Sequence, residues 1–245
     1  MTLATVLLVL VALACGAWAD TLEKEKVILI DWTKGQPFTN FLFRGNEPKL
    51  TNAQGDYFAY TTLVSYLQSA AANHSLTLPS KFWLIDYKLY YFDDPLEDPD
   101  IKLETDFFSQ NPSLGEIRLT QIIGTPTSPS IFPREFVQAE ALDLPNWQHD
   151  KLPQFMQTLH QLLYTQGVNG LPVVLYFHCE CGCDRTGEIA GSYVMRYLNY
   201  TYAQAYAWDQ QVAGRWILPN HNWAMEWFCE YLFYALNFQS IGQCF

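Results

Sequence analysis

Apolar and polar positions along this chain follow two periods, one that suits strands and one that suits helices. Short apolar or β-branched runs predict strands at 26–30, 82–85 and 173–177, and the last run is continuous enough to be buried on both faces. Helical spacing of apolar residues predicts helices within 56–72, 152–164 and 186–198. Alternation of this kind is typical of an α/β protein, so we expect a central mixed sheet flanked by helices.

Three other segments carry turn or loop signals. Residues 38–48 predict an irregular segment closed by Gly and Pro, residues 93–100 are acidic and Pro-rich, and residues 124–133 are rich in Pro, Ser and Thr. The acidic stretch predicts a solvated loop rather than a linker, because aromatic-rich sequence lies on both sides of it. We therefore expect one domain over residues 20–245.

Residues 1–19 have the pattern of a secretory signal peptide. An almost unbroken apolar run at 3–15 ends in small residues that suit a cut after Ala19, and the run is too short for an uncleaved anchor. A second apolar stretch, 223–238, contains Glu226 and Glu230 one helical turn apart, which predicts a core helix with a wet edge rather than a membrane span. We expect a secreted protein, or one in the lumen of the secretory or endolysosomal pathway, without stable membrane insertion.

Composition and charge exclude some functions. The chain holds 14 Lys+Arg against 25 Asp+Glu, a formal net charge of −11, which argues against a nucleic-acid binder because phosphate backbones need clustered positive charge. Hydrophobic residues make up 49% of the chain, enough for a buried core. Asn-x-Ser/Thr sequons at Asn73 and Asn199 fit a glycoprotein of the secretory pathway.

The segment 178–187, HCECGCDRTG, directly follows the predicted buried strand and leads into a predicted helix. A strand, a tight loop and a helix form an anion site, because the loop amides and the helix N-terminus aim unpaired N–H groups at one spot. A thiol placed there has a lowered pKa and becomes a nucleophilic thiolate, which fits Cys179. Arg185 offers a planar pair of donors to a phosphoryl group, and Gly182 lets the backbone turn tightly.

This run resembles the His-Cys-x5-Arg-Thr signature loop of the cysteine-dependent protein tyrosine and dual-specificity phosphatases, a superfamily that also includes phosphoinositide phosphatases and cysteine phytases. Residues 43–48 are similar to the segment that leads into the domain in many compact members. The resemblance implies a phosphotyrosine-phosphatase-like fold and hydrolysis of phosphomonoesters through a phosphocysteine, with no metal or other cofactor. It implies the following roles: nucleophile Cys179, phosphate-binding Arg185, thiolate-orienting His178, and Thr186 as the hydroxyl that helps hydrolyse the intermediate. The same loop would surround the phosphate with Glu180, Cys181, Gly182, Cys183 and Asp184.

Two cysteines, Cys181 and Cys183, are unusual inside such a loop and open a metal-site interpretation. Together with His178 and Cys179 they crowd four soft ligands into six positions. Alternate spacing in one short loop suits a closed tetrahedral site poorly, and a metal would leave Arg185 unexplained. The phosphatase interpretation is favoured.

The cysteine count predicts two disulfides. Residues 20–245 hold five cysteines, an odd number for an oxidising compartment. If Cys179 stays free as the nucleophile, the other four can pair, and we expect the loop cysteines 181 and 183 to bond with Cys229 and Cys244 in either order. A Cys181–Cys183 bond is the less favoured alternative, because it would strain the short loop.

A phosphatase also needs an acid to protonate the leaving oxygen. In the family this acid is usually an Asp on a mobile loop before the cysteine, and residues 147–153, WQHDKLP, resemble that Trp-x-Asp loop. Asp150 is therefore the first candidate. The spacing is shifted by one residue, so His149 could take the acid's place, and Asp143 is a further candidate. Asp184 is another, because loops ending in Asp-Arg-Thr occur in bacterial lipid-type phosphatases.

The substrate is expected to be a phosphoprotein or a phosphorylated small molecule. Glu180 and Asp184 put negative charge at the rim and no Lys lies in the loop, which favours a protein tyrosine or dual-specificity phosphatase over an enzyme for polyanionic inositol phosphates. Cysteine phytases tolerate a Glu here, so an inositol phosphate or phosphoinositide phosphatase stays the alternative. A catalytically silent secreted module that binds phosphate is another, while no motif supports carbohydrate binding. Aromatic residues at 87 and 90–92 could flank a phosphotyrosine ring, although they suit the core better.

Overall fold

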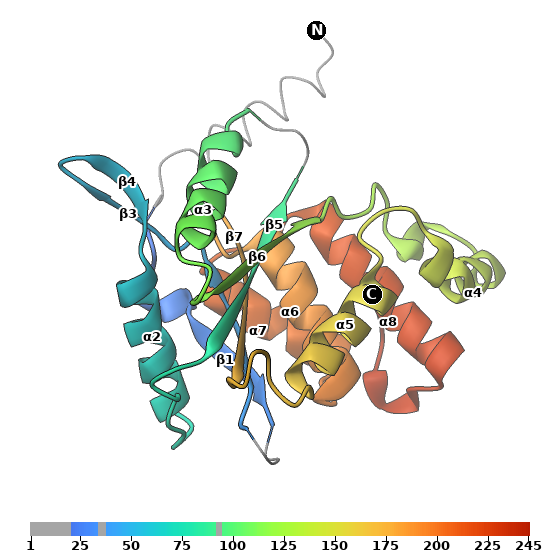
Figure 1. Cartoon of the computed structure of the whole chain (residues 1–245). Coiled ribbons are helices and arrows are strands. Elements are labelled where there is room, and N and C mark those ends of the chain that lie inside the picture. Colours follow the sequence, from blue (N-terminus) through green and yellow to red (C-terminus); the bar gives the residue numbers. More distant parts are fainter. Residues whose placement is uncertain (1–20, 34–37, 92–94) are drawn as a thin grey trace, which may run out of the picture.

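A five-stranded sheet forms the centre of the computed structural model, which describes residues 21–33, 38–91 and 95–245 (Figure 1). The predicted signal peptide lies outside these residues. The strand order is β1-β2-β7-β5-β6, with β1 antiparallel to β2 and the other neighbours parallel. The strands are β1 (Ile28–Trp32), β2 (Phe41–Asn46), β5 (Trp83–Tyr90), β6 (Gly115–Gln121) and β7 (Val173–Cys179). The mixed α/β architecture expected from the sequence is thus confirmed.

Helices cover both faces of this sheet. One face carries α2 (Tyr60–Ala72) and α3 (Asp98–Gln110), and the other carries α5 (Leu152–Leu163), α6 (Asp184–Tyr197) and α8 (Pro219–Leu236) (Figure 1). Alternate residues of β7 supply the two cores: Val174 and Tyr176 pack with α2, whereas Leu175 and Phe177 pack with α5, α6 and α8. The remaining elements are α4 (Arg134–Asp143), α7 (Tyr202–Ala213), the hairpin β3 (Lys49–Asn52) and β4 (Gly55–Phe58), and the 3₁₀ turns Lys24–Lys26, Pro129–Ile131, Leu144–Asn146 and Gln239–Ile241.

Segments with strong apolar periodicity were predicted close to the helices and strands that the structure has. The predicted segments at 152–164, 173–177 and 186–198 correspond to α5, β7 and α6, and the stretch at 223–238 lies largely within α8. The strand predicted at 26–30 begins instead at Ile28, after a 3₁₀ turn. Sequence periodicity missed α4, β6 and α7.

Two predicted loops contain regular secondary structure. Residues 38–48 contain β2, every residue of which is buried between β1 and β7, and its polar members find partners that are distant in sequence. Of the acidic segment, residues 93 and 94 lie outside the described residues and 95–97 form a turn. Residues 98–100 are the start of α3, where Pro99 in the first turn and acids at 98 and 100 favour a helix N-terminus.

The two glutamates of α8 are buried and form no wet edge. Ser128 Oγ donates to Glu226 at 2.5 Å, and Arg134 donates to Glu230 at 3.0 Å. Among the described residues, no helix combines the length and apolar character that crossing a membrane requires. Asn73 and Asn199 are exposed, as glycosylation would require, and their modification stays a prediction.

Candidate active site

The signature loop lies at the carboxyl edge of the central strand. β7 ends at Cys179 and α6 begins at Asp184, so the loop 180–183 sits between a buried strand and a helix N-terminus, where parallel sheets commonly bind ligands. Gly182 has φ +67°, and a Cβ there would lie 2.6 Å from the carbonyl oxygen of Gly45 and 2.9 Å from the amide of Asn46. Only glycine fits this turn.

Cys179 is a buried thiol held by Thr186. The Cys179 amide donates to Thr186 Oγ1 at 2.9 Å, and Thr186 Oγ1 donates to Cys179 Sγ at 3.2 Å. Burial by itself raises the pKa of this thiol, since Cys179 is 2% exposed, but the positive charge of Arg185 and the hydrogen bonds with Thr186 outweigh burial and leave the pKa lowered. The arrangement favours a thiolate, the form that acts as a nucleophile.

Arg185 is fixed by a carboxylate that sequence reasoning missed. Its Nη1 donates to the backbone oxygen of Leu89 at 2.9 Å and to Glu97 Oε1 at 2.5 Å. Glu97 is only 7% exposed and also accepts from the Tyr91 amide at 3.0 Å. It belongs to the acidic segment 93–100, for which the sequence predicts a solvated loop. Both of these guanidinium contacts use the same nitrogen, Nη1.

A second arginine, Arg44, hydrogen-bonds to the backbone of the loop. Arg44 of β2 donates through Nη2 to the backbone oxygen of Gly182 at 3.1 Å, and its Nη1 contacts Asp209 of α7. Both side chains are fully buried. The Glu47 amide donates to the Glu180 backbone oxygen at 3.2 Å. The segment 43–48 therefore fixes the loop through ion pairing and backbone hydrogen bonds.

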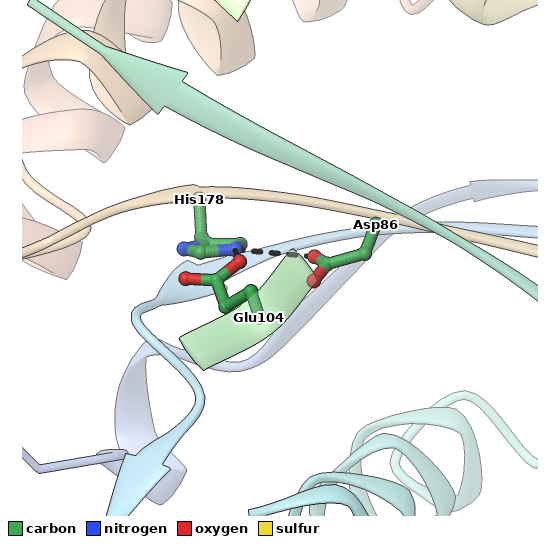
Figure 2. A group of neighbouring side chains, drawn as sticks. All are labelled: Asp86, Glu104 and His178. Carbon is green, nitrogen blue, oxygen red and sulfur yellow. Dashed lines mark ion pairs between the residues drawn. The ribbon is translucent and has the colours of Figure 1, made fainter. Parts of the chain in front are cut away.

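His178 points away from the thiol and joins a buried ionic cluster. Its Nε2 lies 3.1 Å from Asp86 Oδ1 and 3.2 Å from Glu104 Oε2 (Figure 2). Burial alone lowers the pKa of this imidazole, but Glu104 and Asp86 together raise it to about 10, so the ring is charged. The ion pairs of His178 are with these two acids, and the side chain that hydrogen-bonds to Cys179 Sγ in the described part of the chain is Thr186.

These three residues are the one group in the described part of the chain whose ligand atoms could gather around a metal ion. Cations already compensate the acids there: Lys88 Nζ lies 2.9 Å from Glu104 and contacts Glu47, and the charged His178 ring cannot coordinate. The four soft ligands considered from sequence are not gathered either, because His178 faces the acids and the cysteines at 181 and 183 are bonded to each other.

The disulfide pairing expected from sequence is wrong. Cys181 bonds with Cys183 (Cα–Cα 5.2 Å) and Cys229 with Cys244 (Cα–Cα 5.6 Å), while Cys179 is free. Cys229 lies inside α8, fully buried in the core, and Cys244 packs against the same core, so neither reaches the sheet edge where the loop lies. The turn at Gly182 brings the two loop cysteines together instead.

We expect peptide mapping of the unreduced protein to recover Cys181 joined to Cys183 and Cys229 joined to Cys244. Iodoacetamide should label Cys179 alone, because it is the one free thiol among the described residues and has a lowered pKa. Labelling of a cysteine other than 179, or a bridge that includes 179, would contradict this arrangement. A map of the reduced protein provides the control for complete recovery.

Asp150 lies in the loop before α5 and is held by the backbone of the segment that follows β6. Its Oδ1 accepts from the Ile123 amide at 2.7 Å. Burial raises the pKa of Asp150, and hydrogen bonds from the backbone amides of residues 123 and 124 lower it. Burial is the larger effect, so the pKa is raised to about 6. Tyr91 connects it to the loop: burial raises the pKa of this phenol, Arg185 lowers it, and the charges of Asp150 and Glu188 raise it. Both Arg185 and Asp150 therefore act on the same side chain.

The other candidate acids have different surroundings. His149 and Asp143 are exposed, and Asp143 accepts from the Asn146 side chain at 2.7 Å. Both oxygens of Asp184 accept from Arg215, at 2.9 and 2.5 Å, so this carboxylate holds the start of α6 in place. A cavity of about 320 Å³ beside Asp150 is lined mainly by apolar side chains, among them Leu144, Trp147 and Leu152.

The remaining loop residues lie around the turn at Gly182. Glu180 is exposed, while Cys181 and Cys183 form the bonded pair on either side of Gly182. Cys181 Sγ lies 3.9 Å from Lys26 Nζ and 3.9 Å from Arg215 Nη2. Cationic groups therefore lie near the loop disulfide, in addition to the partly buried Arg185.

The site combines a lowered-pKa thiol, a hydroxyl and a guanidinium at one strand–loop–helix turn, an arrangement whose chemistry suits nucleophilic attack by the thiolate. No protein-family model matches the chain, and no curated protein matches it. Among solved structures, the chain is similar to one titled "Crystal structure of Tk-PTP in the active form", with a TM-score of 0.38 and 11% sequence identity over 84% of this chain and 95% of that chain.

Proposed function

We propose that this protein is a cysteine-dependent phosphatase that hydrolyses phosphomonoesters through a phosphocysteine on Cys179. The observation that supports it most is the Cys179 thiol, buried at the turn between β7 and α6, hydrogen-bonded to Thr186 and electrostatically coupled to Arg185. Such a thiolate can attack phosphorus, while Arg185 and the loop amides hold the phosphoryl oxygens.

The reaction runs in two steps that return the enzyme to its starting state. In the first, the Cys179 thiolate forms a bond to phosphorus, the ester P–O bond breaks, and Asp150 gives its proton to the leaving oxygen. In the second, water attacks the phosphocysteine, its proton goes to the Asp150 carboxylate, and the S–P bond breaks. The Thr186 hydroxyl donates to the departing thiolate.

We expect Asp150→Asn to lower kcat for an alkyl phosphate by about 10²- to 10⁴-fold, the usual contribution of a general acid. The alkaline limb of the pH–rate profile should disappear with it, because only the protonated carboxyl can donate. Activated aryl phosphates need less protonation, so a burst of phosphorylated enzyme should stay visible with them. Unchanged turnover in Asp150→Asn, together with a loss in Asp143→Asn or His149→Asn, would move the role of the acid to that residue.

The substrates we propose are phosphotyrosine-type or other lightly charged phosphomonoesters on a protein or small molecule. Each cation found near the rim is paired with an acid, Lys26 with Glu23 and Arg215 with Asp184, so neither offers a free charge to a polyanion. The net charge of −11 acts in the same direction at long range. We also propose a secreted or lumenal location, which the two disulfides support.

Hydrolysis of an aryl phosphate in the presence of a metal chelator tests this function. The proposal predicts turnover that continues with the chelator present. In a separate assay without the chelator, which would itself bind vanadate, vanadate should block turnover, since it occupies a phosphoryl site as a transition-state mimic. A folded protein that binds vanadate without turning over any phosphate ester would instead indicate a silent binding module.

A further inference from the structure

A second buried acid lies one helical turn beyond Arg185. Glu188 of α6 is fully buried, and its Oε2 lies 2.7 Å from His221 Nδ1 of α8. Its carboxyl is also within hydrogen-bonding reach of the Asp150 carboxyl, yet Oε1 has no donor among the described residues. Two carboxyls can bond to each other only when at least one carries a proton, so this geometry indicates a proton held between them.

The surroundings of Glu188 favour its protonated form. Burial raises its pKa well above the ordinary value, and the charge of Asp150 adds to the effect. His221 cannot supply a compensating charge, because its pKa is lowered to about 4. Burial lowers this pKa most. Asp184 raises it, and the positive charges of Arg185 and Arg215 lower it further. The charged and titratable groups that face Glu188, Asp150 and His221 from the packed elements are Tyr91, His149, Asp184, Arg185 and Arg215.

We propose that Glu188 is a positioning residue that shares a proton with Asp150, while neutral His221 fixes the Glu188 carboxyl. The inference rests on the proposed function. Above the pH at which Asp150 alone would lose its proton, the pair keeps one proton, which is available for the leaving oxygen. When the pair gives that proton to the leaving group, the water that attacks the phosphocysteine returns one, so the proton count balances over a turnover.

The kinetic test is the pH dependence of kcat for an alkyl phosphate in Glu188→Gln. The glutamine amide has the shape of the glutamate carboxyl and can donate a hydrogen bond to Asp150. It cannot carry the acidic proton that the Glu188–Asp150 pair keeps at higher pH. The alkaline limb should then move down toward the pKa of Asp150 acting alone, from the higher pKa of the pair in the unchanged protein. A shift of one pH unit lowers kcat on that limb by about tenfold. Turnover of an activated aryl phosphate should change little.

Glu135→Gln, on an exposed position of α4, is the matched control and should leave the profile unchanged. Infrared spectroscopy provides a readout that needs no turnover. At a pH well above 7, where Glu47 and Asp209 with pKa values of about 7 have lost their protons, a carboxylic-acid carbonyl band should persist and should disappear in Glu188→Gln.

The outcomes separate the two proposals. A protein that hydrolyses no phosphate ester but keeps the infrared band contradicts the proposed function and leaves the shared proton standing. A protein that turns over with superposable profiles before and after Glu188→Gln overturns the inference and leaves the phosphatase assignment standing. Should the variant fail to fold, the unchanged protein still decides, because absence of a carboxylic-acid band well above pH 7 overturns the shared proton.

Discussion

Replacing Cys179 with Ser is expected to abolish phosphate-ester turnover, by at least about 10⁴-fold, the scale seen when a covalent nucleophile is removed from a hydrolase. The lowered pKa of Cys179 produces a thiolate, whereas a serine hydroxyl at the same place stays protonated. Steady-state hydrolysis of an aryl phosphate measures the loss. The variant should keep its fold, because the change is nearly isosteric and Thr186 can still bond to the hydroxyl.

Phosphate or vanadate binding provides the control for this experiment. Cys179→Ser should still bind the anion, since Arg185 and the loop amides are unchanged, whereas Arg185→Ala should lose binding. Measurable turnover by Cys179→Ser at more than a small fraction of the original rate would show that another group is the nucleophile.

Arg44→Met is expected to lower the free energy of unfolding by about 3–5 kcal/mol, the cost of leaving a buried charge unpaired. Arg44 and Asp209 are both fully buried, so removing the guanidinium leaves the Asp209 carboxylate without its partner and the Gly182 carbonyl without a donor. Urea unfolding measures the loss. The signature loop should loosen as well, which would raise the concentration of phosphate needed to inhibit the enzyme.

Two further variants show whether the effect comes from the buried charge. Lys102→Met breaks an exposed i,i+4 pair with Asp106 and should cost only about 0.3–0.5 kcal/mol. The double variant Arg44→Met/Asp209→Leu removes both charges and should recover much of the lost stability. An Arg44→Met protein that is as stable as the Lys102→Met protein would show that the buried pair does not hold the loop.

Sequence reasoning worked best where the signal is local. The continuous apolar run of β7, the cysteine-to-arginine spacing and the helical period of α6 are adjacent in the chain, and the structure places them as a strand, a turn and a helix. Gly182 was also recognisable, because a tight turn in the middle of a short loop favours glycine. In the structure its neighbours leave no room for a side chain.

The features that were missed depend on contacts between distant segments. Arg44 interrupts the apolar pattern of β2, and only Asp209, 165 positions later, explains why it can be buried. Glu97 looks like any member of an acidic run until Arg185 lies beside it. Glu188 has no sequence signal at all, since its partners come from the loop before α5 and from α8.

The disulfide error has a similar cause. Cysteine counts give the number of bridges but not the distances, and connectivity cannot be deduced from sequence alone. Strain disfavours a bond across one residue, but the left-handed backbone at Gly182 brings Cys181 and Cys183 within 5.2 Å at their Cα atoms.

Mass spectrometry of the enzyme denatured rapidly during turnover of an aryl phosphate tests the central claim most directly. A covalent phosphatase should carry phosphate on the peptide that contains Cys179, and the label should build up in Asp150→Asn only if hydrolysis of the intermediate becomes the slower step. The account predicts phosphate on Cys179 and on no other residue. Steady turnover with Cys179 unmodified, or phosphate on a different side chain, would contradict it.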